Sequence, residues 1–338
     1  MLNPVLAMHM SDALVSAKVG GIMWVVFLLL LLYSAKKASQ NFDKLNIPLM
    51  GVMAAFVFAA QMLNFSIPAT GSSGHIGGGI LLAATLGAYP AFIALSSVLF
   101  IQALFFADGG ILAFGCNAFN MAFFACFVAY PLVFVPIVRK SKGKFAVIAA
   151  SILACVITLQ CGSFCVVLET LCSDITELDF KTFLLFMQPI HLAIGFVEGV
   201  ATAFVLLAIK DSNAFVFNEL TEGKFMPSKK SAVLLMSIAA VVFGSLFSIY
   251  ASEKPDGLEW SLQNTAKNEI AAEKSAAHLA SENIANSTAI FSDYSTPMLG
   301  GKASTSVAGL MGSLITAAFL FVGYFAFKFV SKTNLNGK

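Results

Sequence analysis

The histidines His9 and His75 are the side chains of this chain best suited to bind a metal ion. His9 follows Met8 near the start of the sequence, and His75 lies in the glycine-rich stretch GSSGHIGGG. Imidazole is the commonest protein ligand for borderline transition metals, and its charge changes near physiological pH. If the fold brings these two side chains together, they can capture a metal. On spacing alone, a hydrogen-bonded structural histidine is the more frequent case, so this alternative stays open.

The order Met8-His9 offers a chelate if the functional chain begins at Met8. The free α-amine, the amide nitrogen of His9 and its imidazole then hold one ion in fused rings, and His75 completes a planar set of four nitrogens. This geometry favours copper(II) or nickel(II) and suits cobalt(II), whereas zinc(II) prefers a tetrahedron. Seven residues, MLNPVLA, precede Met8 and would turn its amine into an amide. We therefore expect the functional protein to begin at Met8.

Further polar residues in apolar surroundings are candidates to support the site. Asp12, three residues after His9, is placed either to accept the remaining imidazole N–H or to cap the first long helix. The others are expected to form hydrogen bonds between helices, worth about 1 kcal/mol each; they are Gln102, Asn117, Asn120, His191 and Glu198. The stretch HLAIGFVEG does not fit a zinc protease, which needs two histidines four residues apart with an adjacent glutamate.

The six cysteines fall in or beside apolar segments and are predicted to pack as small hydrophobic side chains. Cys161, Cys165 and Cys172 have helical spacing, which can align thiols toward a soft metal. The chain contains no Cys-x-x-Cys pair to support that alternative.

The composition is that of a polytopic membrane protein with an all-α fold. Of its 338 residues, 58% are hydrophobic and only 11% charged, and the mean hydropathy is +0.85. A crossing needs about 20 apolar residues, and a helix satisfies its own backbone in lipid. Nine apolar segments are predicted as helices, the third too short to cross alone and paired with the fourth; they are residues 18–34, 48–66, 76–87, 89–106, 111–138, 144–169, 181–209, 231–250 and 306–330.

The positive charges predict the orientation, because cytoplasmic loops are rich in lysine and arginine. They follow alternate spans, at Lys36, Lys37 and Lys44, at Arg139, Lys140, Lys142 and Lys144, at Lys210, Lys224, Lys229 and Lys230, and at Lys332 and Lys338. Nine crossings place all of them on one side. We therefore expect an inner (cytoplasmic) membrane protein with its N-terminus and His75 outside and its C-terminus in the cytoplasm.

Five sequence blocks resemble the CbiM/NikM family of cobalt and nickel importers. They are MHMSDALVS, GSSGHIGGGILLAATLGAYPA, QALFFADGG, GCNAFNMA and HLAIGFVEGVAT, spread over residues 8–210. Farther along the chain, PDGLEW and FSDYSTP are similar to the PDGLE domain, a NikN-like accessory unit. The resemblance implies a body of about seven helices at 8–210, a cytoplasmic linker at 211–230, and an accessory domain at 231–338. That domain would have two transmembrane helices and an outer loop at 251–306.

The resemblance also implies a function. Members of this family are the substrate-capture (S) components of energy-coupling-factor importers. This chain would capture nickel(II) or cobalt(II) outside and deliver it inward, with Met8, His9 and His75 as ligands. Its partners would be a transmembrane coupling (T) subunit and two ATPase subunits, with no nucleic acid among them. The metal would be cargo rather than a permanent cofactor.

Two alternatives remain beside the importer. The chain has no Walker motif, so as an importer subunit it would not be an enzyme and ATP hydrolysis would fall to its partners. A proton-coupled secondary metal transporter would use His191 and Glu198 as a relay, since carboxylates within the membrane mark such paths. A membrane metalloenzyme is the weakest alternative, because no catalytic base stands at ligand spacing beside either His9 or His75. Since every candidate ligand lies within 8–210, we expect that part to carry the metal site by itself.

Overall fold

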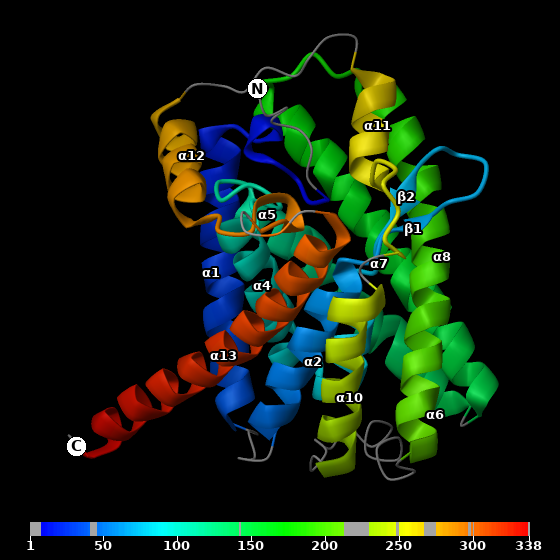
Figure 1. Ribbon diagram of the computed structural model, residues 1–338, viewed down its shortest axis with the longest axis vertical. Helices are drawn as coiled ribbons and strands as arrows, with labels where there is room; N and C mark the ends of the chain where they lie inside the picture. Colours follow the sequence, from blue (N-terminus) through cyan, green and yellow to red (C-terminus); the bar gives the residue numbers. More distant parts are fainter. Residues whose placement is uncertain are drawn as a thin grey trace.

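Helices dominate the computed structural model, which describes residues 8–40, 46–141, 143–212, 230–247, 250–266, 275–296, 299 and 301–336 (Figure 1). The first part of the chain forms, in order, η1 (Asp12–Leu14), α1 (Ala17–Gln40), α2 (Asn46–Gln61), β1 (Phe65–Ser66), β2 (Ser73–Gly74), α3 (Gly79–Leu86), α4 (Ala88–Phe105), α5 (Phe114–Ala118), the π-helix η2 (Phe119–Phe134), α6 (Val135–Lys140), α7 (Lys144–Ser173) and α8 (Phe180–Ser212). The second part forms α10 (Lys230–Val242), the π-helix η3 (Phe243–Phe247), α11 (Gly257–Thr265), α12 (Ala276–Thr288), η5 (Ser292–Tyr294) and α13 (Gly301–Asn336).

The helices confirm the prediction of an all-α polytopic membrane protein. Within the described residues, six are long and apolar enough to cross a membrane; they are Ala17–Gln40, Ala88–Phe105, Phe114–Lys140, Lys144–Ser173, Phe180–Ile209 and Ala303–Phe325. Two shorter apolar helices, Ile47–Gln61 and Val233–Phe247, match further predicted segments. The remaining segment is α3, which packs against α4 and whose eight residues are all buried.

Two predicted helix ends are corrected by the loop that follows α2. This helix ends at Gln61 rather than near residue 66, because Phe65–Ser66 pair antiparallel with Ser73–Gly74. The third segment begins as a helix only at Gly79. Gly78 before it has a φ of 75°, a left-handed conformation that interrupts a helix and that glycine adopts without strain.

The first long helix passes very close to α5. A Cβ atom built on Gly115 would lie 2.4 Å from the carbonyl carbon of Met23 and 2.5 Å from the main-chain nitrogen of Trp24. The Trp24 indole donates a hydrogen bond to the carbonyl of Ile111 in the same crossing, at 2.9 Å. Glycine at 115 therefore sets the distance between α1 and α5.

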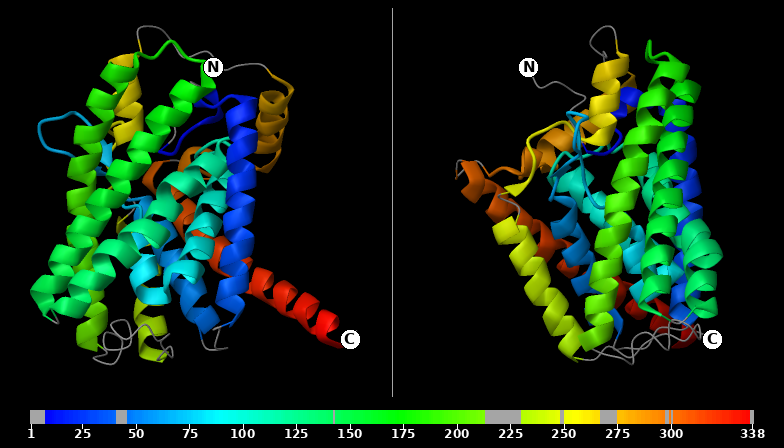
Figure 2. Two further views of the ribbon diagram at one scale, coloured as in Figure 1. Left: turned by 180° about the vertical axis from the view of Figure 1, so that it is seen from behind. Right: turned by 90° about the vertical axis from the view of Figure 1, so that its right-hand side faces the viewer.

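The C-terminal helices pack on the body. Helices α10 and α13 lie against α2, while α11 packs beside α8 and α12 near α4 (Figures 1 and 2). The polar segments 250–266 and 275–296 consequently cover the end of the bundle at which residue 8 lies. The part of the chain predicted as an outer loop is thus folded over the N-terminal segment.

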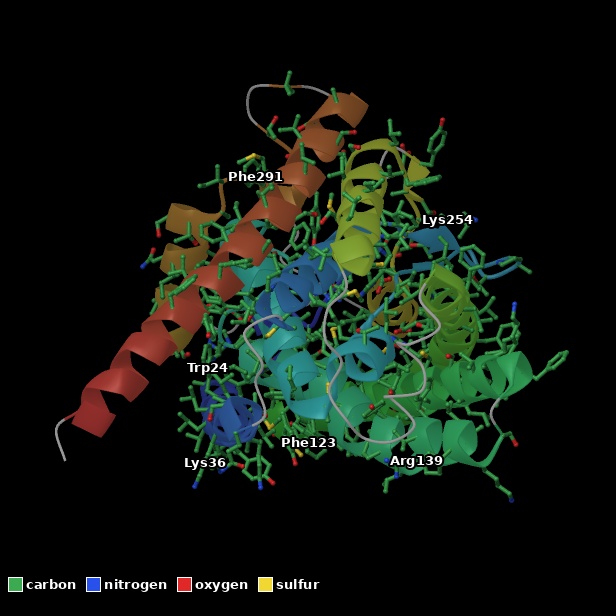
Figure 3. The ribbon with its side chains drawn as sticks, turned by 90° about the horizontal axis from the view of Figure 1, so that it is seen from below. Trp24, Lys36, Phe123, Arg139, Lys254 and Phe291 are labelled. Carbon is green, nitrogen blue, oxygen red and sulfur yellow. The ribbon has the colours of Figure 1, made fainter. Side chains whose placement is uncertain are left out.

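Basic residues gather at the opposite end of the bundle. Figure 3 looks onto this end, where Lys36 of α1 and Arg139 of α6 lie near the rim. The basic residues Lys44, Lys142, Lys224, Lys229 and Lys338 lie outside the described residues, as does the segment 1–7 on which the predicted start at Met8 depends.

Candidate metal centre

The imidazole rings of His9 and His75 are neighbours at the covered end of the bundle. Their centroids are 5.3 Å apart and their planes meet at 81°. His9 is buried, and the side chain of His75 is only 10% exposed. Both rings line a cavity of about 90 Å³, whose wall also contains Met8, Asn117, Asn120, His191, Glu198 and Asp256. The fold therefore brings together the two histidines that the sequence singled out.

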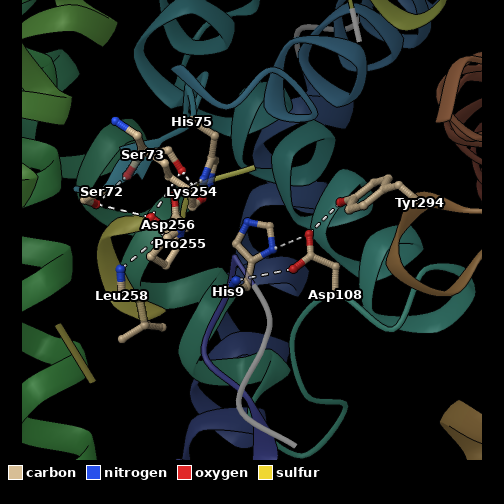
Figure 4. Close-up of polar contacts among 10 residues, drawn as sticks. All are labelled: His9, Ser72, Ser73, His75, Asp108, Lys254, Pro255, Asp256, Leu258 and Tyr294. Atoms are coloured by element: carbon tan, nitrogen blue, oxygen red, sulfur yellow. Dashed lines mark hydrogen bonds and ion pairs between the residues drawn. The ribbon is translucent and has the colours of Figure 1, made fainter. Parts of the chain in front are cut away.

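Asp108 is the carboxylate beside His9. The main-chain N–H of His9 donates to Oδ1 at 3.3 Å, and Nδ1 of its ring lies 3.2 Å from Oδ2 (Figure 4). The hydroxyl of Tyr294 donates to Oδ2 at 2.5 Å. Burial alone would raise the pKa of Asp108, but the contacts with His9 and Tyr294 outweigh it and lower the pKa to about 2. An ionised carboxylate thus faces two nitrogens of His9.

The structure corrects the expectation for Asp12. Its carboxylate accepts a hydrogen bond from the main-chain N–H of Ala113 at 2.8 Å and another from the hydroxyl of Ser281. It is therefore directed toward the start of α5 and toward α12, while Asp108 lies beside His9. It does not cap the first long helix either, because it begins the short η1 turn and α1 starts only at Ala17.

Asn117 fixes the residue that follows His9. Its Oδ1 accepts from the main-chain N–H of Met10 at 3.0 Å, and its Nδ2 donates to the carbonyl of Met10 at 2.9 Å. Gly110 donates to the same carbonyl at 3.0 Å. Asn117 therefore holds the N-terminal segment rather than forming the hydrogen bond between helices that was predicted. In contrast, Asn120 does join two helices.

Two buried carboxamides, Gln102 and Asn120, lie near this segment. Nδ2 of Asn120 donates to Oε2 of Glu169 at 2.6 Å, which links η2 to α7. Glu169 was not singled out from the sequence. Its position as the one carboxylate in the apolar run FCVVLETLC could have identified it as a buried polar residue. The main-chain carbonyl of Gln102 accepts from the N–H of Asp108 at 3.1 Å, so it helps to shape the loop beside His9.

His191 and Glu198 both line the cavity but use different partners. Nδ1 of His191 lies 2.7 Å from the carbonyl of Met187 in its own helix. Oε1 of Glu198 accepts from the main-chain N–H of Gly78 at 2.8 Å. Among the described residues no hydrogen bond joins His191 to Glu198. The contact with Gly78 means that Glu198 anchors the loop that carries His75.

His75 also contacts a carboxylate, which comes from a distant part of the sequence. Nδ1 of His75 lies 3.0 Å from Oδ1 of Asp256, the acid of the PDGLEW block (Figure 4). Burial acts to lower the pKa of His75, but the charge and hydrogen bond of Asp256, with smaller effects of Asp108 and Glu198, raise it above 6.5. The sequence pointed to Asp256 only as part of a motif, not as a site residue.

In the part of the chain that the structure describes, no three His, Cys, Asp or Glu side chains form a group able to hold a metal ion. The six cysteines are free thiols, of which Cys116, Cys126 and Cys155 are buried. An ion at the two histidines would therefore need a ligand from outside this set of side chains. The main-chain nitrogen of His9 faces the same carboxylate as its Nδ1.

Two family models match this chain. The model of the cobalt uptake substrate-specific transmembrane region, CbiM, matches residues 9–214, and that of the PDGLE domain matches residues 230–329. A putative fused nickel transport protein NikMN of Archaeoglobus fulgidus is 33% identical over 93% of this chain and 97% of its own length. The cobalt transport protein CbiM of Acetohalobium arabaticum is 34% identical over 37% of this chain and 50% of its own.

Solved structures agree with these matches. A crystal structure of a transition metal transporter is 31% identical, with a TM-score of 0.54 over 64% of this chain and 97% of that chain. A crystal structure of a truncated transition metal transporter, also 31% identical, has a TM-score of 0.53 over 60% of this chain and 99% of that chain.

Proposed function

This chain belongs to the CbiM family of cobalt uptake substrate-specific transmembrane proteins and carries a C-terminal PDGLE domain; on that premise, we propose that it captures nickel(II) or cobalt(II) outside the cytoplasmic membrane and delivers it inward. It would act as the substrate-specific component of an ATP-driven energy-coupling-factor importer. The observation that carries the proposal is the pairing of His9 and His75 in one largely buried cavity, with ring centroids 5.3 Å apart.

The proposed ligands are nitrogens. The main-chain nitrogen and Nδ1 of His9 lie on one edge of that residue, so both can bind one ion in a six-membered ring. In a chain that begins at Met8, the α-amine adds a second ring, and His75 supplies the fourth nitrogen. Such a planar set suits nickel(II), and cobalt(II) also accepts it. The cluster around Asp108 and Asp256 is anionic, which favours the approach of a divalent cation.

The energy source can be tested with vesicles that contain the purified chain. The sequence has no Walker motif, so we propose that a transmembrane coupling subunit and two ATPase subunits drive the transport. We expect nickel uptake only when these partners and ATP are present. The alternative, a proton-coupled transporter that uses His191 and Glu198, predicts uptake by the chain alone under a pH gradient. Such uptake would exclude the importer mechanism.

Metal binding should weaken in acid. An imidazole ligates an ion in its neutral form, so protons compete with the metal for His75. The carboxylates of Asp256, Asp108 and Glu198 raise the pKa of this ring above 6.5, against the opposing effect of burial. Affinity should therefore rise with pH through 6.5 and continue to rise above it. Calorimetric titration with nickel(II) between about pH 5 and pH 9 measures this, and a flat profile would contradict it.

A further inference from the structure

The loop that carries His75 is joined to the C-terminal domain by hydrogen bonds to main-chain carbonyls of that domain. The N–H of Ser73 donates to the carbonyl of Pro255 at 2.8 Å, and its hydroxyl donates to the carbonyl of Lys254 at 2.7 Å (Figure 4). The hydroxyl of Ser72 also donates to the carbonyl of Pro255, at 3.3 Å. Both serines are fully buried. The segment before α11 therefore forms one wall of the loop that holds the histidine.

Asp256 has two contacts that fix its carboxylate. One oxygen lies 3.0 Å from Nδ1 of His75, and the other accepts the main-chain N–H of Leu258 at 3.5 Å as the N-cap of α11. Asp256 is only 4% exposed. An ionised carboxylate can only accept hydrogen bonds, so the proton of a neutral His75 must reside on Nδ1. The lone pair of Nε2 is then available to an ion.

The neighbours of Asp256 leave it little freedom. A Cβ atom on Gly257 would lie 2.8 Å from Cδ1 of Ile194, so α11 packs closely against side chains of α8 at this point. Leu258 is buried in the same apolar cluster as Met10, next to His9 in sequence. The position of Asp256 relative to His75 is thus set by packing on both sides.

We infer that the C-terminal PDGLE domain completes the metal centre, with Asp256 as the residue that positions His75 toward the ion. This inference rests on the proposed function. Asp256 contacts the ligand rather than the metal, and it acts by fixing the tautomer and the direction of the ring. Carboxylates that support a metal-bound histidine in this way typically contribute about 10- to 100-fold to metal affinity. The expectation that residues 8–210 carry the site by themselves is then incomplete.

Three variants of the full-length chain separate positioning from folding. Asp256→Ser keeps a good N-cap for α11, but its side chain is too short to reach His75. Asp256→Asn keeps the shape and the cap, but an amide both donates and accepts, so it no longer selects one tautomer. Glu259→Gln is the matched control, because it removes a negative charge from the same helix, where the Glu259 carboxylate contacts Gln263.

The probe is nickel(II). The two quantities measured are its affinity for the protein and the ligand-field absorption of the bound ion. We expect Asp256→Ser to lower affinity by about 10- to 100-fold and Asp256→Asn to lie between it and the wild type, with Glu259→Gln within about twofold of the wild type. Without Asp256, His75 should turn away from the ion. The ion in Asp256→Ser then loses one nitrogen ligand, and its absorption band should move to lower energy. A role limited to holding α11 would reduce the fraction of protein that binds and leave the band in place.

The outcomes distinguish the inference from the proposed function. Wild-type affinity and an unchanged band in both Asp256 variants would overturn the positioning role, and so would weakened binding with an unchanged band. Failure of the wild-type chain to bind nickel or cobalt would instead overturn the proposed function, and the inference with it.

Discussion

Replacement of His9 by alanine, in a chain that begins at Met8, is expected to lower the affinity for nickel(II) by about 100-fold or more, because it removes a proposed ligand and not merely a residue that supports one. The main-chain nitrogen of His9 lies 3.3 Å from Oδ1 of Asp108, and its Nδ1 lies 3.2 Å from Oδ2. Both nitrogens therefore face the same side of the residue. Calorimetric titration measures the loss, and the melting temperature shows whether the variant remains folded.

His191→Ala is the matched control for His9→Ala. It removes another imidazole from the wall of the same cavity, but one whose Nδ1 contacts the carbonyl of Met187 in its own helix. We expect its nickel affinity to stay within about threefold of the wild type. If His191→Ala lost binding while His9→Ala kept it, the assignment of the ligands would have to be abandoned.

Gly115→Ala is expected to destabilise the protein by about 1–3 kcal/mol and to weaken nickel binding at the same time. The new methyl group would collide with the backbone of Met23 and Trp24, which cannot rotate away as a side chain can. Helix α1 must therefore shift, and α1 follows directly on the segment that carries His9. Thermal unfolding in detergent and nickel titration report the two effects.

Gly21→Ala provides the comparison within α1. A Cβ atom at this position meets nothing within 4 Å, and alanine favours the helix over glycine by about 1 kcal/mol. This variant should be as stable as the wild type or slightly more stable. An equal loss of stability in both variants would show that the effect comes from the lipid-facing helix in general and not from the crossing at Gly115.

The sequence predicts the helices well because each long apolar run has one stable solution in lipid. It misplaces the end of α2, since Met62, Leu63 and Phe65 continue the apolar run, yet Phe65–Ser66 pair with Ser73–Gly74. Periodicity within one segment carries no information about this partner, which comes from the other side of a loop.

The candidate site is predictable only in part, for a similar reason. His9 and His75 stand out by residue type, since imidazoles are rare in so apolar a chain. The neighbouring acids do not, because Asp108 is predicted only as a loop residue and Asp256 only as part of the PDGLEW motif, and it is the fold that places them beside these rings. Asp12 is near His9 in sequence, but the interaction of its carboxylate with Ala113 takes it elsewhere.

Covalent fusion of the two domains lowers the affinity that the contacts between Pro255 and Ser73 need in order to keep the domains together. Two separate subunits would have to find each other in the membrane, whereas two parts of one chain meet at an effective concentration of about millimolar. Contacts too weak to hold separate proteins together can then keep the PDGLE domain docked for most of the time. The fusion thus keeps the PDGLE domain beside the loop that carries His75 without requiring a high affinity between two separate proteins.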